Sequence, residues 1–237
     1  MKTLGLIGGM SWESTVIYYQ HINQSVKAAL GGLHSAKIIL LSVDFAEVAH
    51  LQAQGDWAAA GAFLADAARK LQAAGADALV LCTNTMHNVA DAIEAAVSIP
   101  LLHIADPTAL AITQQGWHTV GLLGTRFTME QDFYRQRLQA RHGLTVLVPP
   151  PAQREAVHRV IYEELCQGQV QVASHQTYLQ IIDDLQAQGA QAIILGCTEI
   201  GLLIQSGHCA LPLFDTALLH AQYAARWSLG HDTPVLP

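Results

Sequence analysis

Residues 71–83 read LQAAGADALVLCT, and residues 185–197 read LQAQGAQAIILGC. The two segments align without a gap at an offset of 114 residues. Each combines the end of an amphipathic helical pattern, a glycine and a short apolar run that is typical of a buried strand. Because a helix, a turn and a strand recur together, the sequence indicates an internal duplication of an α/β unit.

Two further pairs of segments support this duplication. Residues 3–8 (TLGLIG) resemble residues 119–124 (TVGLLG), and residues 100–103 (PLLH) resemble residues 212–215 (PLFD). All pairs occur in the same order at nearly the same offset, which chance rarely produces. The chain is therefore predicted to contain two copies of a four-stranded α/β unit.

Short β-rich runs alternate with longer helical patterns, which is typical of parallel sheets with helices on both faces. Strands are predicted at residues 3–7, 37–43, 77–82, 101–103, 119–123, 144–148, 192–195 and 211–214. Helices are predicted at residues 16–30, 56–74, 129–141, 154–166, 174–188 and 216–229. We expect the last helix to return to the first copy, which gives a first domain of residues 1–105 plus 211–237 and a second of residues 106–210.

Composition excludes several classes of protein. Of the 237 residues, 51% are hydrophobic and 13% are charged, which favours a compact globular protein over a disordered one. The net charge of -7 does not fit a general nucleic-acid binder. The longest run without Asp, Glu, Lys or Arg, residues 107–125, contains glutamines, a tryptophan and a histidine, and it does not resemble a membrane span.

The N-terminus and the cysteines predict a cytoplasmic protein with reduced thiols. Residues 1–10 lack the long apolar core and small-residue cleavage site of a signal peptide. The four cysteines lie far apart without C-x-x-C spacing, and the twelve histidines show no recognisable ligand spacing. Neither a disulfide framework nor a structural metal is therefore expected.

The duplication also predicts where a ligand binds. In open α/β sheets, ligands bind beyond the carboxyl ends of the strands, and each copy carries a polar cluster there. The clusters are CTNT at residues 82–85 and CTE at residues 197–199, and the alignment pairs Thr83 with Cys197. If the two copies face each other, Thr83 and Cys197 flank one cleft from opposite sides.

Paired groups on opposite faces of a ligand suit inversion at a planar carbanion. One group removes a proton from the α-carbon, and the other delivers a proton to the opposite face. Cys197 suits the first task, because the pKa of a free thiol, about 8.5, can be lowered by neighbouring groups. Asn and Thr side chains and free backbone N–H groups after the strands would hold carboxylate oxygens.

Four motifs together resemble the cofactor-independent aspartate/glutamate racemases: GGM at residues 8–10, TNT at 83–85, GT at 124–125 and GCTE at 196–199. The resemblance covers essentially the whole chain. It implies two Rossmann-like α/β domains, with mostly parallel four-stranded sheets, facing a central cleft. It also implies a homodimer, no pyridoxal phosphate or other cofactor, and proton abstraction by one thiolate with reprotonation by a second thiol.

The sequence departs from the family pattern at three positions. Thr83 stands where the first cysteine is usual, and Glu164 stands where aspartate racemases carry a lysine. The usual arginine after the second strand is missing, and Gln52 is the nearest polar candidate. These departures bear on reversibility and on how the distal carboxylate of a substrate is bound.

The sequence thus predicts a racemase of acidic amino acids, aspartate or glutamate, with Cys197 as the α-proton base. Thr83 is the group on the opposite face, able to donate or relay a proton but not to act as a base at neutral pH. Because the second-half cysteine of the related glutamate racemases faces the α-hydrogen of the L-enantiomer, L-selectivity is expected. The predicted substrate-binding residues are Met10, Gln52, Asn84, Thr85, Thr125, Thr198 and Glu199.

Alternatives remain at this stage. The chain could carry out single-cysteine chemistry of the arylmalonate decarboxylase kind, or it could be an amino-acid binding module that lost catalysis with the first cysteine. Cys82 could act as a displaced base, although one residue along a strand reverses the direction of the side chain. His87 and His103 are interpreted as hydrogen-bonded core groups rather than bases.

Overall fold

The structure, a computed structural model, describes residues 1–231, which form two compact units. The first unit comprises Met1–Ile104 and the segment from His220 onward, and the second comprises Ala105–Leu219. Each unit is built on one four-stranded parallel sheet with helices, so the predicted α/β fold is confirmed. None of the helices within residues 1–231 is long and apolar enough to cross a membrane.

The first unit contains four strands and the helices that connect them. Its elements up to residue 104 are β1 (Leu4–Gly8), α1 (Trp12–Leu30), β2 (Ile38–Ser42), α2 (Phe45–Gln54), α3 (Trp57–Ala73), β3 (Ala78–Leu81), the 3-10 helix η1 (Thr85–Val89), α4 (Ala90–Ala96) and β4 (Leu101–Leu102).

The second unit repeats this plan with more helices. Its elements are α5 (Ala105–Gln114), β5 (Thr119–Gly124), α6 (Arg126–Glu130), α7 (Asp132–His142), β6 (Thr145–Leu147), α8 (Pro151–Glu163), the 3-10 helix η2 (Leu165–Gln167), α9 (Val172–Ala187), β7 (Ala192–Gly196), α10 (Ile200–Leu203) and β8 (Leu213–Asp215). The last helix, α11 (Thr216–Ser228), begins in the second unit and belongs to the first from His220 on.

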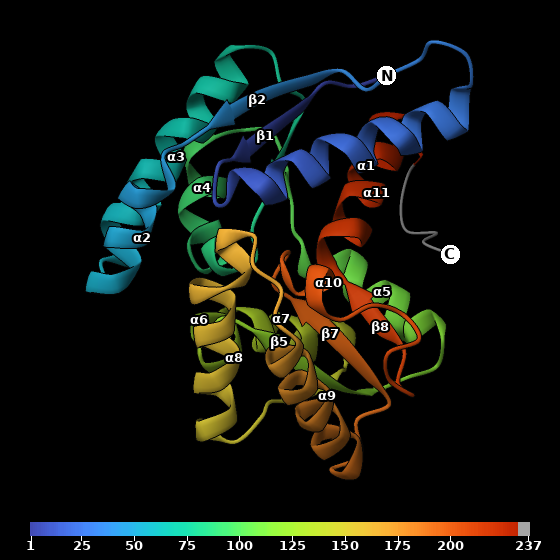
Figure 1. Cartoon of the computed structure of the whole chain (residues 1–237). Helices are drawn as coiled ribbons and strands as arrows, with labels where there is room; N and C mark the ends of the chain where they lie inside the picture. Colours follow the sequence, from blue (N-terminus) through green and yellow to red (C-terminus); the bar gives the residue numbers. More distant parts are fainter. Residues whose placement is uncertain (232–237) are drawn as a thin grey trace. The chain divides into compact units, whose positions relative to one another are not determined.

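The two sheets have the same strand order, as a duplication predicts. The orders are β2-β1-β3-β4 and β6-β5-β7-β8, and every pairing is parallel. Figure 1 shows α2, α3 and α4 on one side of the first sheet and α1 and α11 on the other. In the second sheet, α8 and α9 lie on one side and α5 and α7 on the other (Figure 1). Burial of both faces accounts for the continuous apolar sequences of the strands.

The core of the first unit holds β3 in place. Leu79 and Leu81 belong to a buried cluster that includes Leu64 of α3 and Ile93 of α4. Val80, between them, is fully buried as well, on the opposite face of the sheet. Because β3 is packed on both faces, its register is fixed and the residues that follow its carboxyl end have a defined starting point.

The structure places the second domain boundary later than the sequence analysis does. We expected the chain to return to the first domain at residue 211, but β8 pairs with β7 of the second sheet, so the return comes at His220. The first boundary, between Ile104 and Ala105, differs by one residue from the prediction. Residues 232–237, which the prediction assigned to the first domain, lie outside the described residues.

Within the second unit, Asp106 ties the first turn of α5 to α7. Its carboxylate accepts hydrogen bonds from Arg137 Nε at 2.7 Å and Nη2 at 2.6 Å, and it lies 3.3 Å from His142 Nε2. Burial raises the pKa of Asp106, but the hydrogen bonds and charges of Arg137 and then His142 outweigh burial, so the net pKa is lowered. The carboxylate is therefore the form that the folded unit favours.

We expect Asp106→Asn to lower the free energy of unfolding at pH 7 by about 1–3 kcal/mol, because it removes the anion that pairs with the mostly buried guanidinium of Arg137. Because the pKa of Asp106 is lower in the folded protein than in the unfolded chain, its carboxylate stabilises the folded protein at pH values above the unfolded pKa of about 3.9. This stabilisation is lost as the pH falls through the folded-state pKa. Urea unfolding at a series of pH values should show the difference shrinking toward acid. Asp132→Asn, which breaks an exposed pair with Arg135, is the matched control and should cost little. Equal losses in the two variants would contradict this interpretation.

Candidate active site

The predicted site residues form two groups, one in each unit. The first half-site comprises Met10, Gln52, Thr83, Asn84 and Thr85, and the second half-site comprises Thr125, Cys197, Thr198 and Glu199. All of these side chains are buried. With the exception of Gln52, on α2, they follow the carboxyl ends of the two central strands of each sheet, which are β1 and β3 in the first unit and β5 and β7 in the second.

A tight turn after β1 carries Met10. Gly9 has a φ of +93°, and a Cβ added there would lie 2.2 Å from the carbonyl oxygen of Val43, so the turn requires glycine. Immediately after Met10, the Ser11 side chain accepts a hydrogen bond from the Ser14 N–H and begins α1. The requirement for glycine explains why the GGM motif is found at this point of the chain.

The segment that follows β3 is held by hydrogen bonds from two sides. The Ser14 hydroxyl, in the first turn of α1, donates to the carbonyl of Cys82 at 3.2 Å. The carbonyl of Thr83 accepts a hydrogen bond from His87 Nδ1 at 2.8 Å, and the Thr83 N–H donates to the carbonyl of Leu81 at 2.9 Å. Thr85 then begins η1. The backbone around Thr83 therefore has a well-defined position within the first unit.

Gln52 approaches the same segment from α2. It is one of two buried residues of that helix, and its Nε2 lies 3.0 Å from Sδ of Met86, in η1. The structure thus brings Gln52 next to η1, which begins at Thr85, and its role in closing a substrate pocket stays a prediction.

The geometry of Cys82 argues against its use as a base. Its side chain is fully buried, and its Sγ lies 3.8 Å from the carbonyl oxygen of Val80, within its own strand. Burial raises the pKa of the Cys82 thiol far above its ordinary value. The thiolate is therefore strongly disfavoured at this position, and Cys82 serves the packing of the strand end.

In the second unit, a pair of glycines brings the ends of β5 and β7 together. Gly124 and Gly196 are partners in the parallel register, and a Cβ on Gly124 would lie 2.8 Å from the carbonyl oxygen of Gly196. Thr125 and Cys197 are the residues that follow these glycines. The Thr125 hydroxyl accepts a hydrogen bond from the Thr128 N–H and caps α6.

The centre of the second half-site is a thiol next to a carboxylate. Sγ of Cys197 donates a hydrogen bond to Oε2 of Glu199 at 3.0 Å, and the Thr198 hydroxyl donates to the same oxygen at 2.6 Å. Two donors on one carboxylate oxygen hold the Glu199 side chain in place and aim it at Cys197. A carboxylate in this position can accept the proton of the thiol.

The surroundings of Cys197 favour the neutral thiol. Burial is the largest cause, and the charge of Glu199, a contribution from Cys166 and the hydrogen bond to Glu199 act in the same direction. A backbone hydrogen bond from Glu199 acts in the opposite direction. The net effect raises the pKa of the Cys197 thiol well above its ordinary value, so the neutral thiol is the favoured form.

Glu199→Gln should shift the titration of Cys197 to lower pH, because the substitution removes a negative charge and a proton acceptor. Since the thiolate is the reactive form, the variant should react with iodoacetamide faster than the wild type at a given pH below the plateau. Mass spectrometry of the peptide that contains Cys197 measures this rate. Glu155→Gln, an exposed carboxylate on α8, is the control and should leave the profile unchanged. A shift to higher pH in Glu199→Gln would contradict the assignment.

Sequence analysis missed two residues of α8 in this region. Burial raises the pKa of Tyr162, and the charges of Cys197, Cys166 and Glu199 raise it further, which places its phenol within electrostatic range of the second half-site. His158, one turn earlier, has its ring 4.8 Å from that of Tyr162. Its Nδ1 accepts a hydrogen bond from the N–H of Arg126, the residue after Thr125. The i, i+4 spacing of His158 and Tyr162 was the available signal, because it puts both rings on one face of a predicted helix.

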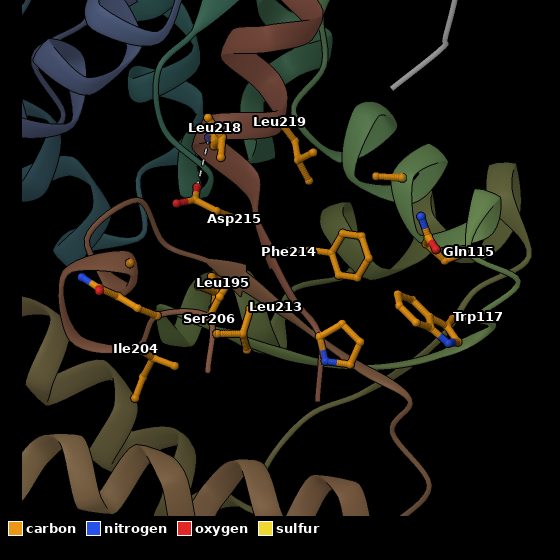
Figure 2. Close-up of a pocket in the computed structure, with 14 residues that line it drawn as sticks. Gln115, Trp117, Leu195, Ile204, Ser206, Leu213, Phe214, Asp215, Leu218 and Leu219 are labelled. Carbon is orange, nitrogen blue, oxygen red and sulfur yellow. Dashed lines mark hydrogen bonds between the residues drawn. The ribbon is translucent and has the colours of Figure 1, made fainter. Parts of the chain in front are cut away.

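A cavity of about 430 Å³ in the second unit contains none of the predicted site residues. It lies beside the edge strand β8 and is lined largely by apolar side chains that include Trp117, Ile204 and Phe214 (Figure 2). The carboxylate of Asp215, also in the lining, accepts hydrogen bonds from the Ala217 and Leu218 N–H groups and thereby caps α11. This carboxylate therefore has a structural role.

The members of each half-site belong to one unit, and their roles, like the pairing of Thr83 with Cys197 across the two units, stay predictions. Within residues 1–231, no group of three or more His, Cys, Asp or Glu side chains is arranged to hold a metal ion. The chemical content of the two half-sites is thus hydroxyls and amides in the first and a thiol–carboxylate pair in the second.

Comparison with known proteins identifies the family to which the chain belongs. The family model of Asp/Glu/hydantoin racemases matches residues 7–224, which include both half-sites. The chain belongs to this racemase family. Members with assigned activities are named as racemases, which are isomerases, so the protein is an enzyme of the isomerase class.

Three relatives illustrate how far the similarity to this racemase family extends. A candidate Asp/Glu racemase from Yersinia pestis is 59% identical, with a TM-score of 0.91 over 97% of this chain and 100% of that one. An aspartate racemase homologue from Pyrococcus horikoshii OT3 is 32% identical, with a TM-score of 0.83 over the same shares of the two chains. The broad specificity amino-acid racemase RacX of Bacillus subtilis (strain 168) is 28% identical over 71% of this chain and 72% of its own.

Proposed function

We propose that the protein racemises aspartate or glutamate by removing and returning the α-proton without a cofactor, with the L-enantiomer as the better substrate. The observation that carries the proposal is the buried thiol of Cys197, hydrogen-bonded at 3.0 Å to Glu199 beyond the carboxyl end of β7. Membership of the racemase family and the similarity to the Yersinia pestis and Pyrococcus horikoshii proteins support the choice of substrate class.

The proposed reaction begins with the transfer of the Cys197 proton to Glu199, whose Oε2 already accepts it in a hydrogen bond. The charge of Glu199 itself raises the pKa of the Cys197 thiol and so opposes formation of a thiolate. A substrate ammonium group bound next to Glu199 offsets that charge and therefore makes the thiolate accessible. The Cys197 thiolate then takes the α-hydrogen as a proton, and the electron pair of the broken C–H bond remains on the substrate as a carbanion.

The carbanion is completed by a proton delivered to either face. Return from the Cys197 thiol restores the original enantiomer. Delivery through Thr83, whose hydroxyl passes on its proton and takes one from solvent in the same step, gives the opposite one, and Glu199 then releases its proton to solvent. The proposal therefore requires Thr83 and Cys197 to approach opposite faces of one α-carbon. Asn84, Thr85, Thr125, Thr198 and Glu199 are assigned to the α-carboxylate and α-amine, and Met10 and Gln52 to closing the pocket; this assignment follows the family motifs and the burial of these side chains.

Incubation of the enzyme with L- and D-amino acids in D₂O, followed by NMR of the α-position, tests this function. We expect α-deuteration of L-aspartate or L-glutamate together with slow appearance of the D-form. Neutral and basic amino acids belong in the panel, because the relative RacX is named as broad in specificity. Deuteration of neutral or basic amino acids alone would contradict an acidic substrate.

The same experiment separates the alternatives. A single-cysteine decarboxylase would release CO₂ from a malonate-type substrate and leave the amino acids unlabelled. An amino-acid binding protein would broaden the NMR lines of its ligand without α-deuteration. Activity that is lost on treatment with EDTA, or on stripping of pyridoxal phosphate, would contradict cofactor independence.

Two further properties are proposed from the family resemblance. We expect the enzyme to act as a homodimer and to work in the cytoplasm on a small-molecule amino acid. Sedimentation velocity at micromolar concentration distinguishes a dimer from a monomer, and fractionation of cells that express the protein tests its location.

A further inference from the structure

Three histidines gather in the interior of the first unit, and the proposed chemistry uses none of them. The side chains of His87, His103 and His220 are 2%, 4% and 0% exposed. The ring centroid of His87 lies 4.4 Å from that of His103 and 6.0 Å from that of His220. Imidazoles buried this deeply need hydrogen-bond partners for their ring nitrogens, and these partners define their protonation state.

The partners of His87 select one neutral tautomer. The backbone N–H of Ile104 lies 3.2 Å from Nε2 of His87, and since an amide N–H can only donate, Nε2 is the acceptor. On the other side of the ring, Nδ1 lies 2.8 Å from the carbonyl oxygen of Thr83, which can only accept. His87 is therefore neutral with its proton on Nδ1, and it links Thr83 to Ile104.

His220 has the opposite tautomer. Its Nε2 lies 2.6 Å from the carbonyl oxygen of Leu102, so this nitrogen carries the proton and donates. Its Nδ1, 2.9 Å from the Tyr18 hydroxyl, accepts the hydrogen bond of the phenol. His220 thus links α1 and α11 to the end of β4 through hydrogen bonds to Tyr18 and Leu102.

Two residues of this hydrogen-bonded cluster, Ile104 and His220, lie where the chain passes from one unit to the other. Ile104 is the last residue of the first unit before the chain enters the second, and His220 is the first residue after the chain returns. The hydrogen bond from Ile104 to His87 therefore connects the first crossing directly to the segment that follows β3. A single planar ring therefore bridges the Ile104 N–H and the Thr83 carbonyl.

We propose that His87, through its two hydrogen bonds, is a positioning residue that fixes the orientation of Thr83 relative to the crossing at Ile104. The inference rests on the proposed function, in which Thr83 serves inversion while Cys197 serves proton abstraction. It predicts that His87 controls how the carbanion is partitioned, because His87 is hydrogen-bonded to Thr83 in the first unit while Cys197 belongs to the second. A misplacement of about 1 Å at a reacting group commonly costs about 10²-fold in rate.

Three substitutions separate the two hydrogen bonds of His87. Asparagine can place an amide N–H near the position of Nδ1 and keep the bond to Thr83, whereas glutamine can place an amide oxygen near the position of Nε2 and keep the bond to Ile104. Alanine removes both. The measured quantity is the rate of inversion divided by the rate of α-exchange with retention, for L-substrate in D₂O. We expect this ratio to fall about 10-fold or more in His87→Ala and His87→Gln, which lose the bond to Thr83. In His87→Asn, which keeps that bond, the ratio should stay close to that of the wild type.

His220→Gln is the matched control, since it alters another buried histidine of the same cluster whose hydrogen bonds go to Tyr18 and Leu102. Its ratio should equal that of the wild type. Because the ratio is internal to each sample, a loss of folded protein lowers both rates and leaves it unchanged. Hydrogen exchange of the Ile104 amide gives an independent measurement, and we expect faster exchange in His87→Ala and His87→Asn than in His87→Gln.

The possible outcomes distinguish this inference from the function on which it rests. An absence of α-deuteration by the wild type with every amino acid overturns the proposed function and this inference together. Wild-type exchange with an unchanged ratio in His87→Ala overturns this inference alone. Two-bond ¹H–¹⁵N correlation spectra of the wild type should show a protonated Nδ1 in His87 and a protonated Nε2 in His220. A protonated Nε2 in His87 would overturn the inference without any activity measurement.

Discussion

Cys197→Ser is expected to abolish α-deuteration of both enantiomers of the substrate. The hydroxyl of serine is far less acidic than a thiol, so Glu199 cannot convert it into a usable base at neutral pH. Loss of a general base typically lowers the rate by about 10²–10⁴-fold, and we expect a loss at the upper end of this range because no second thiol is assigned to the site. The rate of α-deuteration in D₂O, measured by NMR with L-aspartate and L-glutamate, gives the result.

The other cysteines provide the controls for this substitution. Cys209→Ser alters a half-buried thiol of the same unit whose Sγ lies 3.4 Å from the carbonyl oxygen of Leu211, and it should retain activity. Cys82→Ser tests the displaced-base alternative, because Cys82 directly precedes Thr83. Exchange that survives in Cys197→Ser but disappears in Cys82→Ser would assign the base to the first unit and overturn the proposed mechanism.

The strands could be predicted because each is a short apolar run that is buried on both faces. All eight predicted strands are present within residues 1–231. Glycines at the turns helped to mark where the predicted helices end. The helix α2 was missed because only Val48 and Gln52 of its residues are buried, so its apolar stripe is narrow. The match of residues 212–215 to residues 100–103 already indicated that β8 is the fourth strand of the second sheet, and the predicted boundary at residue 211 did not follow that match.

The candidate site was predictable where it follows from strand order and not where it depends on packing. Cys197 and Thr125 follow neighbouring strands, so the duplication was enough to group them. The approach of Tyr162 to Cys197 depends on the rotation of α8 against the sheet, which the sequence does not specify. The His87 bond to Ile104 likewise joins residues that are brought together only when β3 and β4 pair side by side.

The second large effect concerns handedness and follows from the difference between Thr83 and Cys197. In the proposed reaction, only the face served by Cys197 has a group that can become a base at neutral pH, so D-substrate should exchange its α-hydrogen at least about 10²-fold more slowly than L-substrate at matched saturation. For the L-substrate, exchange with retention should be faster than inversion, because the Cys197 thiol can return a deuteron readily. The two enantiomers have equal free energies in solution, so a poor reaction from D to L must appear as weak D-binding or low turnover.

Thr83→Cys should open the second face to proton abstraction. A thiol at position 83 would supply the base that the D-enantiomer lacks, and we expect its α-exchange to rise by about 10²-fold or more while L-exchange through Cys197 continues. Thr83→Ser is the matched control, since it keeps a hydroxyl and changes the size of the side chain, and it should leave the preference for L intact. The side chain of Thr83 is 8% exposed, so a thiol of similar volume fits its surroundings. If Thr83→Cys folds as the wild type does and its preference for L-substrate is unchanged, Thr83 does not face the α-carbon. If the wild type already exchanges D-substrate as fast as L-substrate, the protein does not use a single base.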